Sequence, residues 1–130
     1  MIDVACAIIV NTDDTILVAQ RSGEMSLPLK MEFPGGKVEA GETATDCVVR
    51  EIKEELNLDI LPLSQLVPSV HAYPNFTIRL IPFICQMKGG EIRLKEHLAY
   101  AWLTPAKLLD LDWADADIPI VKSYLNMVNY

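Results

Sequence analysis

The chain has 130 residues, 51% of them hydrophobic, so it is long enough to bury a core and short enough to form one domain over residues 1–130. Its formal net charge of -7 excludes a surface built to bind a nucleic acid polymer, and a phosphate substrate would need a bridging cation. No apolar run approaches the roughly 20 residues of a membrane span, so we expect a cytoplasmic protein with no membrane partner.

The N-terminal third predicts a β-hairpin followed by loops. Val4–Val10 and Thr15–Gln20 are apolar, β-branched runs that are separated by short polar residues, which is typical of two paired strands. A loop then leads to a short extended segment at Met31–Phe33. The glycines and the proline in residues 34–41 predict a tightly bent loop without regular structure.

The rest of the chain predicts one central helix, further strands and a C-terminal helix. Thr43–Leu56 has apolar residues at helical spacing, namely Val48, Val49, Ile52 and Leu56. A strand interrupted by prolines and a longer strand at Phe76–Met87 follow, with a turn at residues 88–91 and another strand at Leu98–Leu103. Thr104-Pro105 predicts a short helix, and Ile118–Val128 an amphipathic one. This order favours an α/β (α+β) fold, a mixed β-sheet sandwiched between helices.

The cysteines predict buried thiols. Cys6, Cys47 and Cys85 are an odd number at wide spacing among apolar neighbours, which favours neither a disulfide framework nor a zinc site.

Three carboxylates lie on one stripe of the central helix. At about 100° per residue, Glu54 and Glu55 flank Glu51 and border the apolar stripe. Like charges at Glu51 and Glu55 oppose helix formation, and partial burial increases that cost. The stripe is either an ordinary solvated face or a site for a hard divalent cation such as Mg²⁺, and the adjacent glycine loop favours the cation.

The segment Gly36–Leu58, GKVEAGETATDCVVREIKEELNL, resembles the motif of the Nudix hydrolases. That motif is a glycine, five residues, a glutamate, seven residues, and then Arg-Glu-apolar-x-Glu-Glu-x-Gly-apolar. Asn57 departs from it where the family usually has glycine, and asparagine is the next most tolerant residue for a left-handed helix end. Similarity to the MutT-type branch extends over nearly the whole chain. It implies a Nudix fold and hydrolysis of a nucleoside triphosphate to a monophosphate and pyrophosphate.

The resemblance implies roles for the acidic residues. Mg²⁺, or Mn²⁺ as a substitute, would be held by the Gly35 carbonyl with Glu51, Glu54, Glu55 and Glu96. Glu51 is the first choice as general base, with Glu54 and Glu96 behind it. Arg50 is expected to orient the glutamates. His97, beside Glu96, is interpreted as a surface histidine.

Substrate contacts are expected from a separate group of residues. Arg21 is the preferred phosphate cation and Lys37 the second, with solvated side chains as the alternative. The base is expected against Phe33, Tyr73 and Ile78, although Phe33 fits core packing as well. Asp117 fits two roles, an acceptor for the amino edge of cytosine or guanine, or the N-cap of the last helix.

Two alternatives to this function remain open at the level of sequence. The substrate could be another nucleoside diphosphate derivative, such as ADP-ribose or a dinucleoside polyphosphate. The chain could also be a non-catalytic nucleotide-binding or metal-binding module, although the complete glutamate set favours catalysis. The expected partner is a small nucleotide, and the expected assembly is a monomer, with a dimer not excluded.

Overall fold

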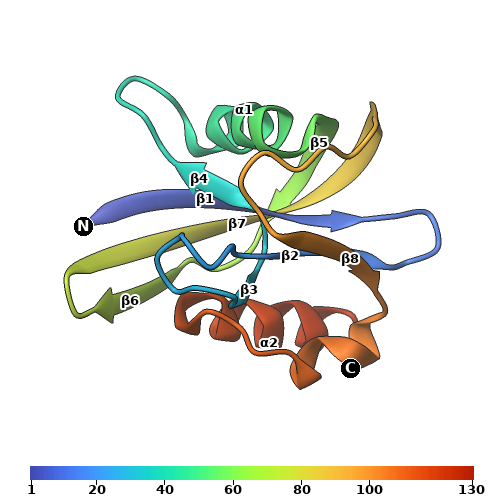
Figure 1. Ribbon diagram of the computed structural model, residues 1–130. Coiled ribbons are helices and arrows are strands. Elements are labelled where there is room, and N and C mark those ends of the chain that lie inside the picture. Colours follow the sequence, from blue (N-terminus) through green and yellow to red (C-terminus); the bar gives the residue numbers. More distant parts are fainter.

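The computed structural model describes residues 1–130 as a mixed sheet between two helices. Helix α1 (Ala44–Leu56) covers one face of the sheet and α2 (Ile118–Met127) covers the other (Figure 1). Two short 3₁₀ helices, η1 (Pro105–Asp110) and η2 (Asp115–Asp117), precede α2. The predicted α/β (α+β) class is confirmed. No helix combines the length and the apolar character needed to cross a bilayer.

Eight strands form the sheet. They are β1 (Ile2–Val10), β2 (Ile16–Gln20), β3 (Met31–Glu32), β4 (Gly35–Lys37), β5 (Leu58–Gln65), β6 (Ser69–Tyr73), β7 (Phe76–Gly90) and β8 (Ala99–Leu103). The main path has the order β3-β2-β1-β7-β5, with β4 beside β1, β6 beside β7 and β8 beside β2. The β1·β7 pair is parallel and the other pairs are antiparallel.

Strand β1 is buried on both faces because a helix covers each side. Ala5, Ala7 and Ile9 pack with the α1 side of the core, whereas Cys6 and Ile8 pack with the α2 side. Successive side chains of a strand point to opposite faces, so two covered faces require a continuous apolar run. This explains why the sequence of β1 shows no alternation of apolar and polar residues.

One edge of β1 is shared by two strands. β2 pairs with it only at Val10, whereas β4 pairs with Val4, Ala5 and Cys6. The prediction that residues 34–41 lack regular structure is therefore wrong for Gly35–Lys37. A Cβ at Gly35 would collide with the backbone of Ala5, so the glycine is what lets this strand approach β1.

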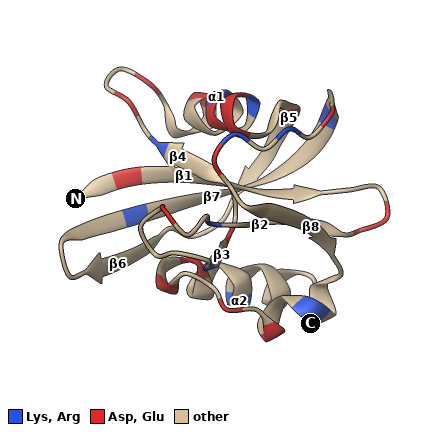
Figure 2. Ribbon diagram, in the orientation of Figure 1, with Lys and Arg blue, Asp and Glu red and all other residues tan.

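Helix α1, which carries acidic residues together with basic ones (Figure 2), begins and ends as its sequence predicts. The Thr43 hydroxyl accepts a hydrogen bond from the Asp46 amide at 3.0 Å, and Asn57 ends the helix with φ of 59°. Val49 is exposed, contrary to prediction, and Cys47 is buried in its place. Strand β7 also continues through residues 88–90, where a turn was predicted, because Leu58 and Asp59 pair with Gly90 and Gly89.

Candidate active site

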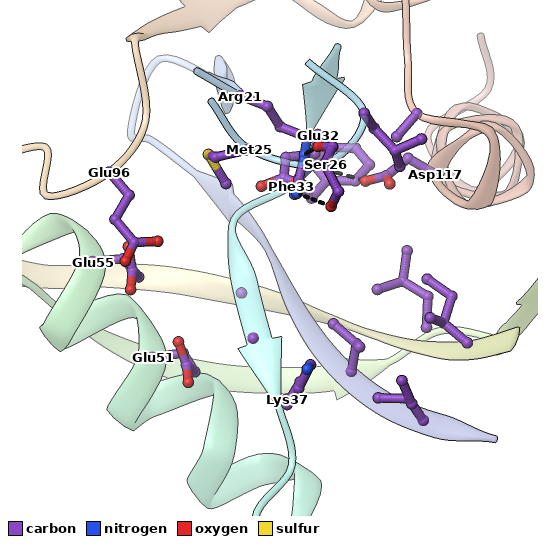
Figure 3. A pocket seen from close by; sticks show the side chains of 18 of the residues that line it. Arg21, Met25, Ser26, Glu32, Phe33, Lys37, Glu51, Glu55, Glu96 and Asp117 are labelled. Atoms are coloured by element: carbon purple, nitrogen blue, oxygen red, sulfur yellow. Dashed lines mark hydrogen bonds and ion pairs between the residues drawn. The ribbon is translucent and has the colours of Figure 1, made fainter. Parts of the chain in front are cut away.

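A cavity of about 480 Å³ is lined by residues of α1 and of several strands, and it contains most of the predicted site residues. One end is acidic and is lined by Glu51 and Glu55 of α1, Glu96, and the glycines of β4. The other end is mainly apolar and includes Phe33, Tyr73, Phe76, Ile78 and Leu80, with Asp117 among them. Figure 3 shows the acidic and Asp117 ends on opposite sides of β4. This volume is ordinary for a small-molecule site.

Two glutamates of α1 face the cavity, and the third does not line it. Figure 3 shows Glu51 and Glu55 pointing from the helix toward β4, with the carboxyl group of Glu96 beside that of Glu55. Glu54 has a side chain that is 49% exposed and lies 3.2 Å from Arg50. No three acidic, histidine or cysteine side chains converge closely enough to bind one cation as they stand. The predicted stripe is therefore split between the cavity and the outer surface.

Arg50 holds the helix carboxylates in place. Its guanidinium group donates to Glu42 at 2.6 Å, to Glu51 at 2.9 Å and to Glu54 at 3.2 Å. The hydrogen bonds from Arg50, followed by the one from the Glu39 amide, lower the pKa of Glu42 to about 2. The contacts by which Arg50 was expected to orient the glutamates are present. Glu42 in turn holds the guanidinium group of Arg50 in place.

The surroundings of the two cavity-facing glutamates disfavour their ionised form. Burial raises the pKa of Glu51, although its hydrogen bond to Arg50 opposes the shift. Burial and then the charge of Glu96 raise the pKa of Glu55, and its Oε2 atom is buried without a hydrogen-bond partner. A buried, unpaired carboxylate oxygen is unfavourable unless a ligand completes it. The oxygen ligands present therefore suit a hard cation.

Gly36 brings β4 against this cluster. A Cβ at this position would collide with the carboxyl group of Glu51. The glycine therefore creates the space in which that carboxyl group lies.

Arg21 belongs to a chain of polar contacts that the sequence did not reveal. Its guanidinium group bonds to Glu32 at 2.7 Å and to the Ser26 carbonyl at 2.6 Å. Glu32 in turn lies 2.7 Å from the Nε2 atom of His97. Arg21 lines the cavity but is less free to bind a phosphate than predicted, and Lys37 is the more exposed cation.

His97 is buried, so its interpretation as a surface histidine is wrong. The side chain is 3% exposed, pairs with Glu32 and, like Glu32, lines the cavity. The sequence contains no clear signal for this pair. Glu32 lies in a strand of only two residues, and 65 positions separate it from His97.

The side chains of the apolar end are packed against the core or hydrogen-bonded to it. Phe33 is 2% exposed and packs on Trp113 with ring centroids 4.9 Å apart, so it is both a core residue and a cavity wall. The hydroxyl of Tyr73 accepts a hydrogen bond from the Ala116 amide at 2.9 Å. Ile78 lines the same wall. These side chains offer a flat apolar surface suited to a base.

Asp117 occupies the N-cap position of α2, as one alternative predicted, but its side chain makes no capping hydrogen bond to the helix. Its Oδ2 atom accepts a hydrogen bond from the Phe33 amide at 2.9 Å. The residue is 5% exposed, and burial, followed by the charge of Glu32, raises its pKa well above the ordinary value. A raised pKa favours the neutral carboxyl group, which can donate as well as accept, whereas the sequence predicted only an acceptor.

The Nudix domain family model matches residues 1–124 of the chain. The chain belongs to the Nudix family of hydrolases. The family's pyrophosphohydrolase chemistry, expected from the Gly36–Leu58 motif, is thereby confirmed at the level of the enzyme class.

Several relatives of this Nudix hydrolase have names that include an activity. The chain is 32% identical over 125 residues to the CTP pyrophosphohydrolase of Escherichia coli K12. The aligned residues cover 96% of this chain and 92% of the relative. It is 30% identical over 120 residues to the 8-oxo-dGTP diphosphatase of the same strain, covering 92% and 93%. The solution structure of MutT from methicillin-resistant Staphylococcus aureus 252 is 42% identical, has a TM-score of 0.78, and covers 97% of this chain and 96% of that one.

Proposed function

We propose that this Nudix hydrolase cleaves a nucleoside triphosphate to a nucleoside monophosphate and pyrophosphate in the presence of Mg²⁺, and that it acts on oxidised purine or on cytosine nucleotides. The observation that carries the proposal is the two-ended cavity, with carboxylates at one end and aromatic walls with Asp117 at the other. The names of the relatives support both base classes. Removal of damaged nucleotides from the pool is the role that this activity would serve.

Glu51, Glu55 and Glu96 are the proposed metal-holding residues, joined by Glu54 and the Gly35 carbonyl. The buried, unpartnered Oε2 atom of Glu55 is the observation that fits a cation best. Mg²⁺, or Mn²⁺ in its place, would supply charge neutralisation for the triphosphate and a more acidic water. Glu54 would have to leave its contact with Arg50 to take part.

Glu51 is the proposed general base. Its raised pKa brings the carboxylate nearer to the range in which it can accept a proton from the attacking water. Arg50 keeps one oxygen of Glu51 fixed at 2.9 Å, so the side chain is oriented before the substrate arrives. Glu54 and Glu96 remain the second choices for this role.

The triphosphate is proposed to lie along β4. Lys37 follows the two glycines of this strand and lines the cavity beside the acidic end. Arg21 lies on the opposite wall, where its bonds to Glu32 and Ser26 fix its position. We assign the direct phosphate contact to Lys37. Arg21 is retained as a second cation, whose positive charge favours an anionic substrate from the opposite wall of the cavity.

The base is proposed to stack between the walls formed by Phe33, Tyr73 and Ile78. Asp117 would face its polar edge with the oxygen that the Phe33 amide does not occupy. An ionised Asp117 suits the N4 amino group of cytosine or the N1 and N2 edge of guanine, whereas the neutral group also suits an acceptor on the base.

A substrate panel tests the proposal. Canonical, 8-oxo and 5-substituted nucleoside triphosphates, ADP-ribose and a dinucleoside polyphosphate are compared with the wild type, Glu54→Gln and Glu55→Gln. We expect pyrophosphate from one class of triphosphate, strict dependence on Mg²⁺, and a loss of at least tenfold in Glu55→Gln. Equal turnover by the wild type and both variants would overturn the assignment of the acidic end. Preferential cleavage of ADP-ribose would replace the proposed substrate class.

A further inference from the structure

The segment between β7 and β8 carries Glu96 and has no helix or strand of its own. It leaves β7 after Gly90, passes beside α1, and reaches β8 at Ala99 (Figure 1). We call residues 91–97 the Glu96 arm. An irregular segment of this kind holds a side chain in place only through contacts with its neighbours.

The first part of the arm is bonded to the end of α1. The Arg93 amide donates to the Leu56 carbonyl at 3.0 Å, and the Lys95 amide donates to the Glu55 carbonyl at 3.2 Å. Carbonyl groups in the last turn of a helix have no partner within the helix, so the arm completes them. The bond to Glu55 places the arm beside the residue whose carboxyl group faces Glu96.

Asn57 adds a bond that glycine could not make. It occupies the left-handed helix end with φ of 59°, where the Nudix-like motif usually has glycine. Its side-chain amide donates to the Glu91 carbonyl at 3.0 Å, at the start of the arm. Glycine would adopt this backbone conformation without strain but has no side chain to donate to the Glu91 carbonyl. The departure from the motif therefore brings a specific contact to the arm.

The last part of the arm is bonded to the opposite wall of the cavity. His97 is buried and pairs with Glu32 of β3 at 2.7 Å. The next amide, that of Leu98, donates to the Gln20 carbonyl at 2.9 Å. Glu96 thus lies between one tie to α1 and another to β2 and β3.

The hydrogen bonds at the two ends of the Glu96 arm oppose the electrostatic repulsion between Glu55 and Glu96. Figure 3 shows the carboxyl groups of Glu55 and Glu96 side by side, although both bear negative charge when ionised. Like charges at close range favour separation, and Glu96 is exposed, so nothing on its solvent side retains it. A free arm would carry Glu96 away from the cavity.

We propose that Asn57 and His97 are positioning residues that hold Glu96 beside Glu55 at the metal end of the cavity. This inference rests on the proposed function, because Glu96 is assigned there as a metal-holding residue. Asn57 acts at the start of the arm and His97 at its end, and neither is assigned contact with the substrate.

Asn57→Gly is the main test, with Asn129→Gly as its matched control. Asn129 also has a left-handed backbone, with φ of 65°, but it lies beyond α2. In metal-free protein, we expect the Arg93 and Lys95 amides of Asn57→Gly to exchange hydrogen at least threefold faster, with the interior amides of α1 unchanged. Asn129→Gly should leave these rates at the wild-type values. Unchanged exchange in Asn57→Gly would overturn the role of Asn57.

Mn²⁺ binding, measured directly by electron paramagnetic resonance, shows whether the tie acts through Glu96. We expect Asn57→Gly to weaken binding about twofold to tenfold, the factor that one ordinary hydrogen bond represents. The same change in a Glu96→Gln background should have no further effect. An equal loss in both backgrounds would contradict positioning through Glu96.

His97 is tested by a pair of substitutions. His97→Gln retains a donor toward Glu32, whereas His97→Leu removes it, so Mn²⁺ affinity should be weakened more by leucine than by glutamine. Equal losses at equal thermal stability would overturn the role of His97. If wild-type protein binds Mn²⁺ but releases no pyrophosphate, the proposed function fails while these comparisons still decide the positioning roles.

Discussion

Substitution of Glu55 by glutamine should stabilise the metal-free protein. Glu55 has one buried oxygen without a partner, and burial and the nearby Glu96 raise its pKa. A raised pKa means that the ionised group opposes folding above its ordinary pKa, and that stability increases as the pH falls through the folded value. Because Glu55 is only partly buried, the cost lies at the low end of the usual range, about 1 kcal/mol.

The assay is thermal unfolding at pH 7.5 in EDTA and in Mg²⁺. For a chain of 130 residues, about 1 kcal/mol corresponds to a rise of roughly 4 °C in the Tm of Glu55→Gln in EDTA. Mg²⁺ at ten times its Kd should stabilise the wild type by about 1.4 kcal/mol and the variant much less. Metal binding therefore reverses the order of the two proteins.

Glu54→Gln is the matched control, since it removes a carboxylate from the same helix that is exposed and paired with Arg50. We expect its stability in EDTA to stay within about 0.5 kcal/mol of the wild type. The reasoning is refuted if Glu55→Gln is less stable than the wild type in EDTA, or if Mg²⁺ stabilises Glu55→Gln as much as it stabilises the wild type.

Three further predictions concern Glu42 and Gly36, which lie beside this cluster, and Asp117 at the other end of the cavity. Glu42→Gln should lower Tm at pH 7, and the difference should disappear as the pH falls from about 4.5 toward 2, because the pKa of Glu42 is lowered to about 2 by Arg50; a difference independent of pH would contradict this. Gly36→Ala should displace the Glu51 carboxyl group and reduce kcat at least tenfold. The change in Tm should be small, since only a flexible side chain blocks the new Cβ. Full activity of the variant would contradict the role of Glu51 in catalysis. Asp117→Asn should change the ratio of kcat/KM between guanine and cytosine nucleotides more than the maximal rate, and an unchanged ratio would remove Asp117 from base recognition.

The elements that the sequence predicted well are those fixed by local chemistry. Helix α1 has a side-chain cap at Thr43 and a left-handed residue at Asn57, and both signals are short-range. Strand β4 was missed because glycine usually weakens a strand, whereas here close approach to β1 requires it. The end of β7 was missed because its last pairs depend on β5, which is distant in the chain.

The candidate site shows the same division. Spacing along one helix predicted that Glu51 and Glu55 would share a face, and both line the cavity. The same spacing allows Glu54 to pair with Arg50 at i,i+4, and the structure contains this pair. Spacing alone could not decide that Glu54 would lie outside the cavity, because a rotation of one side chain decides between the two faces. The pairing of His97 with Glu32 depends on the course of the Glu96 arm, which no local pattern specifies.

The most direct test of the central claim is the amount of pyrophosphate released from 8-oxo-dGTP or CTP as Mg²⁺ is titrated into EDTA-treated protein. The account predicts one pyrophosphate for each nucleoside monophosphate, no release without the metal, and a loss of at least tenfold in Glu55→Gln. Release of orthophosphate instead, or undiminished turnover by Glu55→Gln or in EDTA, would contradict it.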